Sequence, residues 1–95
     1  MKFQLSRLAN NDLESIWEYT FTNWSNEQAD IYVNQIITQI NKVCNNPEIG
    51  RQIFDIKPNH RMIKINFHFI VYKVDAEILK INRIVHERMD IPNRI

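Results

Sequence analysis

The sequence predicts a single α+β domain over residues 1–95. The expected element order is β-α-α-β-β-β, with an N-terminal helical hairpin packed on a mainly antiparallel sheet. The chain has 95 residues, which is the length of one domain. In its first half, apolar residues recur three and four positions apart, as on one face of a helix. Its second half breaks into short runs rich in β-branched and aromatic residues, which is typical of strands.

The N-terminal region is expected to form a short strand followed by a helix. Residues 2–7 alternate Phe3 and Leu5 with polar neighbours, which is a strand pattern. From about Ala9 to Trp24 the apolar spacing changes to three and four. This spacing places five apolar side chains on one helical stripe, which we expect to face the core: Leu13, Ile16, Trp17, Phe21 and Trp24.

A second helix is expected to begin at Ser25, which precedes Gln28 by three residues in the capping-box pattern. Pro47 follows Asn45 and Asn46 and ends this helix, because proline cannot continue it. The very short connection between the helices predicts an antiparallel helical hairpin. The second helix presents one broad apolar face: Ala29, Tyr32, Val33, Ile36, Ile37, Ile40, Val43 and Cys44.

The C-terminal half is expected to form a three-stranded antiparallel meander over residues 61–65, 68–74 and 77–86. The expected turns lie at residues 66–67 and 75–76. The middle run is apolar at both parities, with Phe69 and Val71 on one side and Ile70 and Tyr72 on the other. A strand that is apolar on both sides is buried on both sides. The helical hairpin can cover one face, and we expect a partner protein to cover the other.

The glycine content excludes three kinds of functional loop. The chain has a single glycine, Gly50. The dinucleotide-binding GxGxxG loop, the phosphate-binding GxxxxGK[ST] loop and the GxSxG nucleophile elbow each need at least two glycines. None of the three can therefore be present.

Cysteine content and apolar runs bear on the compartment. Cys44 is the only cysteine, so an intrachain disulfide and a multi-cysteine zinc site are excluded, and a reducing cytoplasm is favoured. The N-terminus lacks the apolar stretch of a secretory signal. The longest apolar run, Phe69–Tyr72, is far shorter than the roughly 20 residues of a membrane helix. We expect a cytoplasmic protein with no membrane partner.

Charge is distributed unevenly along the chain. The net charge of +1 is far from the strongly basic balance of a general nucleic-acid-coating protein, so no strong intrinsic nucleic-acid binding is expected. Residues 1–47 carry three basic and five acidic groups, whereas residues 48–95 carry nine basic and six acidic groups. Between Asp55 and Asp75 there is no acid. The basic groups and histidines of this segment form either a cationic surface for an acidic partner or nucleic acid, or a solvated strand face. They are Lys57, His60, Arg61, Lys64, His68 and Lys73.

Most reactive side chains have ordinary structural interpretations. Glu14 and Glu18 lie four apart on the polar side of the first predicted helix, where a solvated face is expected. Cys44 lies on the apolar stripe of the second helix, where an inert core thiol is expected. The three histidines come from different segments without metal-ligand spacing. We therefore expect no metal site and no cofactor.

The run around Arg83 is the strongest functional candidate. Ile81, Arg83 and Val85 are expected to share one strand face, and an arginine on an apolar face is costly unless its guanidinium has a partner. The partner is either a structural one, Asp90 or a carboxylate of the first helix, or an anion that Arg61 also contacts. Phosphodiester cleavage would need cationic groups and a general acid or base in one place. The sequence supplies these types without showing that they converge: Arg61, Lys64, Tyr72, Arg83 and His86.

Several motifs, in order along nearly the whole chain, resemble those of a known family. The first is Ala9-x-x-Asp12-Leu13-x-x-Ile16-Trp17-x-Tyr19-Thr20, followed by Trp24, Gln28-Ala29, Tyr32 and Asn46-Pro47 with Gly50-Arg51. The later ones are Arg61, His68-x-x-x-Tyr72-x-Val74 and Ile81-x-Arg83-Ile84-x-His86-x-Arg88-Met89-Asp90. Together they resemble the ParE toxins of the RelE/ParE superfamily, which belong to type II toxin–antitoxin systems.

The chain departs from the family pattern at two turns. Asn59-His60 and Asn66-Phe67 stand where family members commonly carry glycine. Asparagine tolerates left-handed backbone better than most residues, so both turns are still expected to form.

The resemblance implies a bacterial toxin that poisons DNA gyrase and blocks replication. Such a toxin acts by binding rather than as an enzyme, and a cognate ParD-like antitoxin neutralises it in a hetero-oligomer. The antitoxin's C-terminal part is expected to lie in a groove as a helix followed by an extended segment, with contact residues unassigned. The alternatives are a RelE-like ribosome-dependent mRNA endonuclease and a non-toxic interaction module of the same fold. The residues predicted to serve toxicity and target binding are Arg61, Arg83, His86, Arg88, Met89 and Asp90.

Overall fold

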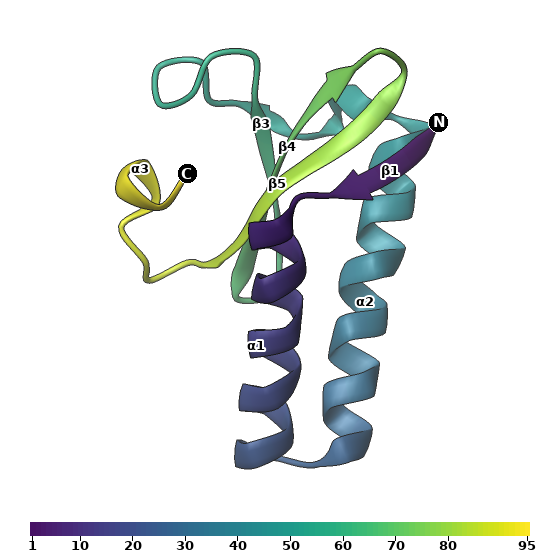
Figure 1. Cartoon of the computed structure of the whole chain (residues 1–95), viewed down its shortest axis with the longest axis vertical. Coiled ribbons are helices and arrows are strands. Elements are labelled where there is room, and N and C mark those ends of the chain that lie inside the picture. The colour runs from purple at the N-terminus through teal and green to yellow at the C-terminus, as the bar shows by residue number, and fades with distance from the viewer.

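The computed structural model describes all 95 residues and confirms the predicted α+β class. Five strands form one sheet in the order β1-β5-β4-β3-β2, in which β1 runs parallel to β5 and the other neighbours are antiparallel. The helical hairpin lies against one face of this sheet (Figure 1). The structure adds three short elements, η1, β2 and α3, to the predicted order. The elements are β1 (Lys2–Leu5), α1 (Arg7–Asn23), α2 (Asn26–Asn45), η1 (Pro47–Ile49), β2 (Arg51–Gln52), β3 (Arg61–Ile65), β4 (His68–Asp75), β5 (Ile78–His86) and α3 (Ile91–Arg94).

Serine side chains set the start of both long helices. The Ser25 hydroxyl accepts a hydrogen bond from the backbone N–H of Gln28 at 3.0 Å, which confirms the predicted cap. Ser6 plays the same role for α1, because its hydroxyl accepts from the Ala9 N–H at 2.9 Å. The first helix therefore begins at Arg7, two residues before the predicted start, and β1 ends at Leu5.

The core lies on both faces of the sheet. The larger cluster fills the space between the helical hairpin and the sheet. It comprises Ala9, Leu13, Ile16, Ile36, Ile40, Val43, Cys44, Ile70, Tyr72, Leu79, Ile81 and Ile84. On the opposite face, Ile53, Met62 and Val71 form a second cluster, against which Phe69 and Ile95 pack. The expectation that a partner protein must cover this face of β4 is wrong. The segment after β2 and the C-terminal residues cover it, so Val71 is fully buried within the chain.

An irregularity in β5 changes which of its side chains share a face. Val71 pairs with Arg83 whereas the next residue, Tyr72, pairs with Ile81, so Asn82 has no partner on β4. The bulge reverses the alternation of side chains along β5. Ile81 therefore faces the helices with Ile84, and Arg83 points to the other side. The prediction that Ile81 and Arg83 share a face is wrong for this reason.

The free end of the helical hairpin projects beyond the sheet (Figure 1). Leu13 and Ile16 in α1 are buried, but farther along the same stripe Phe21 is 49% exposed and Trp24 is 75% exposed. The predicted stripe is present, but its last part does not face the core, because no strand lies beneath that end of the helix. Trp17 and Phe21 stack on each other there, with ring centroids 5.2 Å apart.

The tight turns of the sheet use residues other than glycine. Asn59 and Asn66, which stand at the positions expected to need left-handed backbone, have φ angles of 63° and 51°. The β4–β5 hairpin turns one residue later than predicted, at Ala76 and Glu77, and both residues have positive φ angles of 51° and 62°. Positive φ at both central residues fits a two-residue hairpin, but it is strained for side chains other than glycine or asparagine.

Gly50 is required by a close approach of Tyr72. Its φ of −76° is ordinary, but a Cβ at this position would lie 2.3 Å from the Tyr72 hydroxyl. That hydroxyl accepts from the Gly50 N–H at 2.9 Å and donates to the Pro47 carbonyl at 2.7 Å. Tyr72 thus anchors the helix-to-sheet connection from within the core, and burial raises its pKa.

No helix of the fold is both long and apolar enough to cross a membrane.

Candidate functional site

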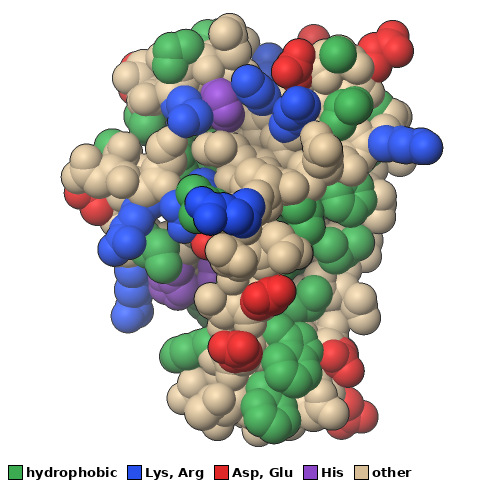
Figure 2. Space-filling view, viewed as in Figure 1, with side chains coloured by type: hydrophobic (Ala, Val, Ile, Leu, Met, Phe, Trp, Pro, Cys, Tyr) green, Lys and Arg blue, Asp and Glu red, His purple; other side chains and the backbone are tan.

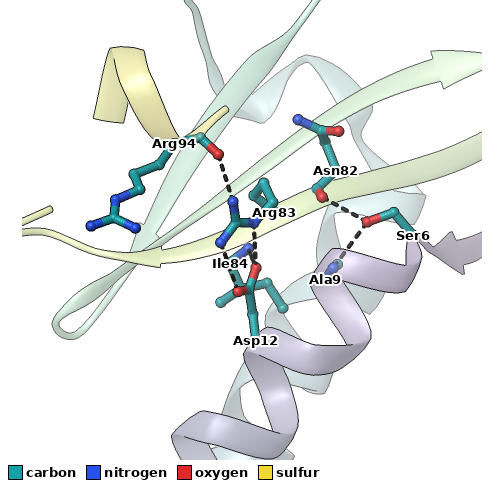
Figure 3. Close-up of polar contacts among 7 residues, drawn as sticks. All are labelled: Ser6, Ala9, Asp12, Asn82, Arg83, Ile84 and Arg94. Atoms are coloured by element: carbon teal, nitrogen blue, oxygen red, sulfur yellow. Dashed lines mark hydrogen bonds and ion pairs between the residues drawn. The ribbon is translucent and has the colours of Figure 1, made fainter. Parts of the chain in front are cut away.

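Arg83 is held by an ion pair with Asp12 of α1 (Figure 3). Its Nε and Nη2 donate to the two carboxylate oxygens of Asp12 at 2.8 and 2.9 Å, and its Nη1 donates to the Arg94 carbonyl at 2.6 Å. The two side chains are only 16% and 15% exposed. The hydrogen bonding of Arg83 to Asp12 raises the pKa of Arg83 above its usual value. Of the two predicted interpretations, the structural ion pair with the first helix is the one present.

Asp12 also completes the edge of β5. The strand β1 covers this edge only as far as Ile81, whose carbonyl accepts from the Ser6 N–H at 3.0 Å. Beyond it, the Ser6 hydroxyl donates to the Asn82 carbonyl at 2.7 Å, and Asp12 accepts from the Ile84 N–H at 2.9 Å. The first turns of α1 therefore supply the hydrogen bonds that a longer β1 would have made.

Arg61 does not join Arg83. It pairs across strands with Tyr72 on the helix-facing side, whereas Arg83 pairs with Val71 on the opposite side. The Arg61 guanidinium donates to the Gly50 carbonyl at 2.8 Å and to the Glu48 carbonyl at 3.3 Å. Arg61 thus fastens the loop between η1 and β2, and the two arginines leave the sheet in opposite directions.

The residues after β5 form a turn that starts at His86. The His86 ring accepts through Nδ1 from the Arg88 N–H at 3.1 Å, and its carbonyl accepts from the Met89 N–H at 3.0 Å. Asp90 directly precedes the last helical turn, α3, and its carboxylate accepts from the Asn93 side-chain amide at 2.6 Å. Arg88 and Met89 are left exposed, whereas His86 is half-buried.

A groove of about 870 Å³ opens between the helical hairpin and the end of the sheet that carries the β3–β4 turn. His86, Arg88 and Met89 line it, but Arg61, Arg83 and Asp90 do not. The remaining walls come from α1, α2 and the β3–β4 turn. They are Asp12, Ser15, Ile16, Tyr19, Thr20, Trp24, Gln28, Ile31, Tyr32, Gln35, Asn66, Phe67, His68 and Ile84.

The groove is lined by a cluster of aromatic side chains from α2, the β3–β4 turn, β4 and β5. The Tyr32 hydroxyl lies 2.6 Å from His68 Nδ1 and donates to the Ile65 carbonyl at 3.2 Å. Burial, and then the neighbouring His86, lower the pKa of His68 to about 4. The His68 and His86 rings pack in a T-shaped arrangement with centroids 5.1 Å apart, and Phe67 stacks on His86 with centroids 6.5 Å apart. At neutral pH the His68 imidazole is therefore uncharged.

The other reactive side chains form no second site. No group of three histidine, cysteine or acidic side chains is arranged to hold a metal ion. His60 is nearly buried and its Nδ1 lies 2.7 Å from the Pro58 carbonyl. Cys44 lies in the main core as predicted, and burial raises the pKa of its thiol.

The sequence profile of the family described as "ParE toxin of type II toxin-antitoxin system, parDE" matches residues 3–91. The chain belongs to the ParE toxin family. Toxin ParE1 of Mycobacterium tuberculosis is 32% identical over 95 residues, covering 99% of this chain and 97% of that protein. Toxin ParE1 of Caulobacter vibrioides is 28% identical over 88 residues, covering 93% of this chain and 91% of that protein.

A solved structure supports the fold of this ParE toxin independently. The structure described as "Chromosomal ParDE TA system from P. aeruginosa" superposes with a TM-score of 0.79 at 20% identity. The match covers 90% of this chain and 95% of that one. At this level of identity the similarity shows the fold alone.

Several groove residues of this ParE toxin escaped the sequence prediction. Tyr19 is 68% exposed and Phe67 is 62% exposed, and neither was assigned a site role. Ile31 is 47% exposed and lies outside the predicted apolar face of α2. A large apolar residue off the core-facing stripe is the signal that identifies such positions. Trp24 could not be found in this way, because its spacing is that of a core residue.

Proposed function

We propose that this ParE toxin poisons DNA gyrase, blocks replication, and is neutralised by a cognate ParD-like antitoxin in a hetero-oligomer. The observation that carries the proposal is the match to the ParE family across residues 3–91, together with relatives named Toxin ParE1 that align over nearly their full length. The gyrase target comes from the resemblance in sequence motifs.

The positions of the cationic side chains support binding over catalysis. Arg61 is committed to backbone carbonyls, Arg83 to Asp12, and Lys64 to Glu87 at 2.7 Å. Tyr72 is buried beneath Gly50. Phosphodiester cleavage needs such groups to converge on the reacting phosphate, and here each is already engaged within the fold.

We assign direct target contact to the exposed part of the C-terminal run. Arg88 and Met89 are exposed at the rim of the groove, and the turn from His86 to Asp90 holds them there. Arg83 then acts as a positioning residue, because it ties the end of the chain to α1. The double variant Arg88→Ala with Met89→Ala is expected to fold normally and to lose toxicity.

We assign the antitoxin to the groove. An amphipathic segment could bury the apolar side chains that this ParE toxin exposes there, and such burial stabilises a complex by roughly 25 cal/mol per Å² of apolar surface. The double variant Trp24→Ser with Ile31→Ser should weaken antitoxin binding strongly in calorimetry. Phe54→Ser, which removes an apolar side chain that is 50% exposed outside the groove, is the control. Equal affinity of the groove variant and the control would refute this assignment.

One growth experiment separates the target hypotheses. Expression without antitoxin is expected to induce the DNA-damage response and to stop replication while translation continues. Purified toxin should make gyrase accumulate cleaved DNA. Prompt translation arrest with codon-dependent mRNA cleavage would instead support the RelE-like endonuclease. Growth unaffected by a soluble, folded toxin would support the non-toxic interaction module.

A further inference from the structure

The sheet face that points away from the helices carries many cationic side chains. Residues that pair directly across neighbouring strands point to the same side. Met62 and Val71, paired in the second core cluster, define this outer face, and the register extends it across all five strands. Its members with charge are Lys2, Arg51, Lys64, Lys73, Asp75, Lys80 and Arg83. Asp75 is the only acid among them.

Only part of this charge is neutralised within the chain. Lys64 pairs with Glu87 at 2.7 Å, and Lys80 pairs with Asp75 at 3.6 Å. Arg83 is engaged by Asp12. No ion pair joins Lys2, Arg51 or Lys73 to a carboxylate. The outer face therefore keeps a net positive charge.

Lys73 and Lys80 form the centre of the outer face. They are directly opposed on β4 and β5, and Gln4 on β1 lies next to Lys80. Like charges directly opposed across two strands destabilise a sheet, so this pair does not serve the fold. On its other side, Lys73 follows Tyr72, which pairs with Arg61, and His60 directly precedes Arg61 at the start of β3. Burial lowers the pKa of His60, and the charges of Lys57 and Lys73 lower it further.

The helical side of the molecule carries mainly acidic charge. No lysine or arginine occurs between Arg7 and Lys42, whereas this stretch contains five acids. In Figure 2 the free end of the helical hairpin shows apolar and acidic side chains, and the Lys and Arg side chains lie over the rest of the molecule, which contains the sheet and the C-terminal segment. Such segregation orients an approaching polyanion toward the sheet.

We propose that the outer face binds the phosphate backbone of duplex DNA, so that the toxin contacts the DNA segment held by gyrase as well as the enzyme. At least one cation lies on each strand of the outer face, so the cations form a row from one edge of the sheet to the other: Lys2, Lys80, Lys73, Lys64 and Arg51. A row matches a linear polyanion, whereas a small anion needs groups that converge in a cavity. The groove lies on the helix side, and none of its lining residues belongs to the outer face.

This inference rests on the proposed function, and the contact with DNA is expected to be weak. The few free cations predict an affinity for isolated duplex in the non-specific range of about 10⁻⁴ to 10⁻⁶ M. That agrees with the modest net charge of +1. DNA already bound by gyrase is presented at high local concentration, so weak contacts are sufficient there.

The test compares wild-type toxin with the double variant Lys73→Gln, Lys80→Gln. The matched control is Arg7→Gln with Lys42→Gln, which removes the same charge from exposed positions on the helices. The probe is a fluorescently labelled DNA duplex of mixed sequence, titrated between about 50 and 200 mM salt. The sheet variant should bind at least about tenfold more weakly, and its salt slope should fall by about two. Its thermal midpoint should stay unchanged or rise, because the opposed lysines repel each other.

A second readout separates the inference from the proposed function. In a gyrase cleavage assay, the sheet variant should trap much less cleaved DNA than wild type and the control variant. Normal trapping by a variant that no longer binds duplex would overturn the DNA contact and leave gyrase poisoning intact. The DNA contact would also be overturned if the wild-type toxin failed to bind duplex. The same holds if the sheet variant lost affinity only for the antitoxin. Duplex binding without any trapped gyrase would overturn the proposed function and support the DNA-binding face alone.

Discussion

Removing the Asp12 carboxylate tests how α1 is joined to the sheet and to the C-terminus. Asp12→Ala deletes the acceptor of three hydrogen bonds, two from Arg83 and one from the Ile84 N–H. It leaves a guanidinium that is 16% exposed without its counter-ion. Breaking a buried ion pair costs about 3–5 kcal/mol, and we expect about 3 kcal/mol here because the pair keeps some solvent contact. For a domain of this size that loss lowers Tm by roughly 12–24 °C.

The assay is urea unfolding followed by circular dichroism. Glu14→Ala is the matched control, because it removes an exposed carboxylate from the same helix whose only contact is Asn10 at 3.5 Å. We expect the control to change stability by less than about 0.5 kcal/mol. Asp12→Ala with Arg83→Ala should cost about 2 kcal/mol less than the sum of the single variants. Equal effects of the Asp12 and Glu14 variants, or strict additivity in the cycle, would refute the ion-pair argument.

Three further predictions concern stability. Gly50→Ala should destabilise the protein by about 2–3 kcal/mol in thermal unfolding, because the new Cβ would lie 2.3 Å from the Tyr72 hydroxyl; an unchanged Tm would contradict the close packing. Glu77→Gly should stabilise it by about 1 kcal/mol, since glycine relieves the positive φ of 62°, and a lower Tm would count against strain in this turn. His68 has a folded pKa of about 4, lowered by burial and by His86, against about 6.5 when unfolded. Its contribution to stability is complete above about pH 6.5 and is lost as pH falls toward 4, so His68→Gln should flatten the pH profile of the urea midpoint over that range.

The elements that local chemistry defines could be read from the sequence. Ser25 caps α2 because its hydroxyl reaches an amide three residues on, and this depends on nothing distant. Asn59 and Asn66 take left-handed backbone for an equally local reason. Periodicity likewise found the buried face of α2, including Ile36, Ile40 and Val43.

The wrong predictions concern residues whose orientation or burial depends on contacts with residues distant in the sequence. The bulge at Asn82 exists because β5 pairs with β4, and it moves Ile81 and Arg83 to opposite faces without any local signal. Trp24 has the spacing of a core residue, yet α1 extends beyond the sheet and leaves it 75% exposed. Within the candidate site, the exposed Arg88 and Met89 line the groove, whereas Arg83 forms an ion pair with Asp12.

By itself, the sequence determined the order of the main helices and strands, the Ser25 cap, the asparagine turns and the family, because these depend on residues close together along the chain. Only the tertiary structure decided the partner of Arg83, 71 residues away, the covering of β4 by the segment after β2 and the C-terminal residues, and the row of cations on the outer face. The physical reason is that a charge or an apolar surface acquires its role from what lies against it. That contact depends on strand register and packing, which periodicity along the chain does not report.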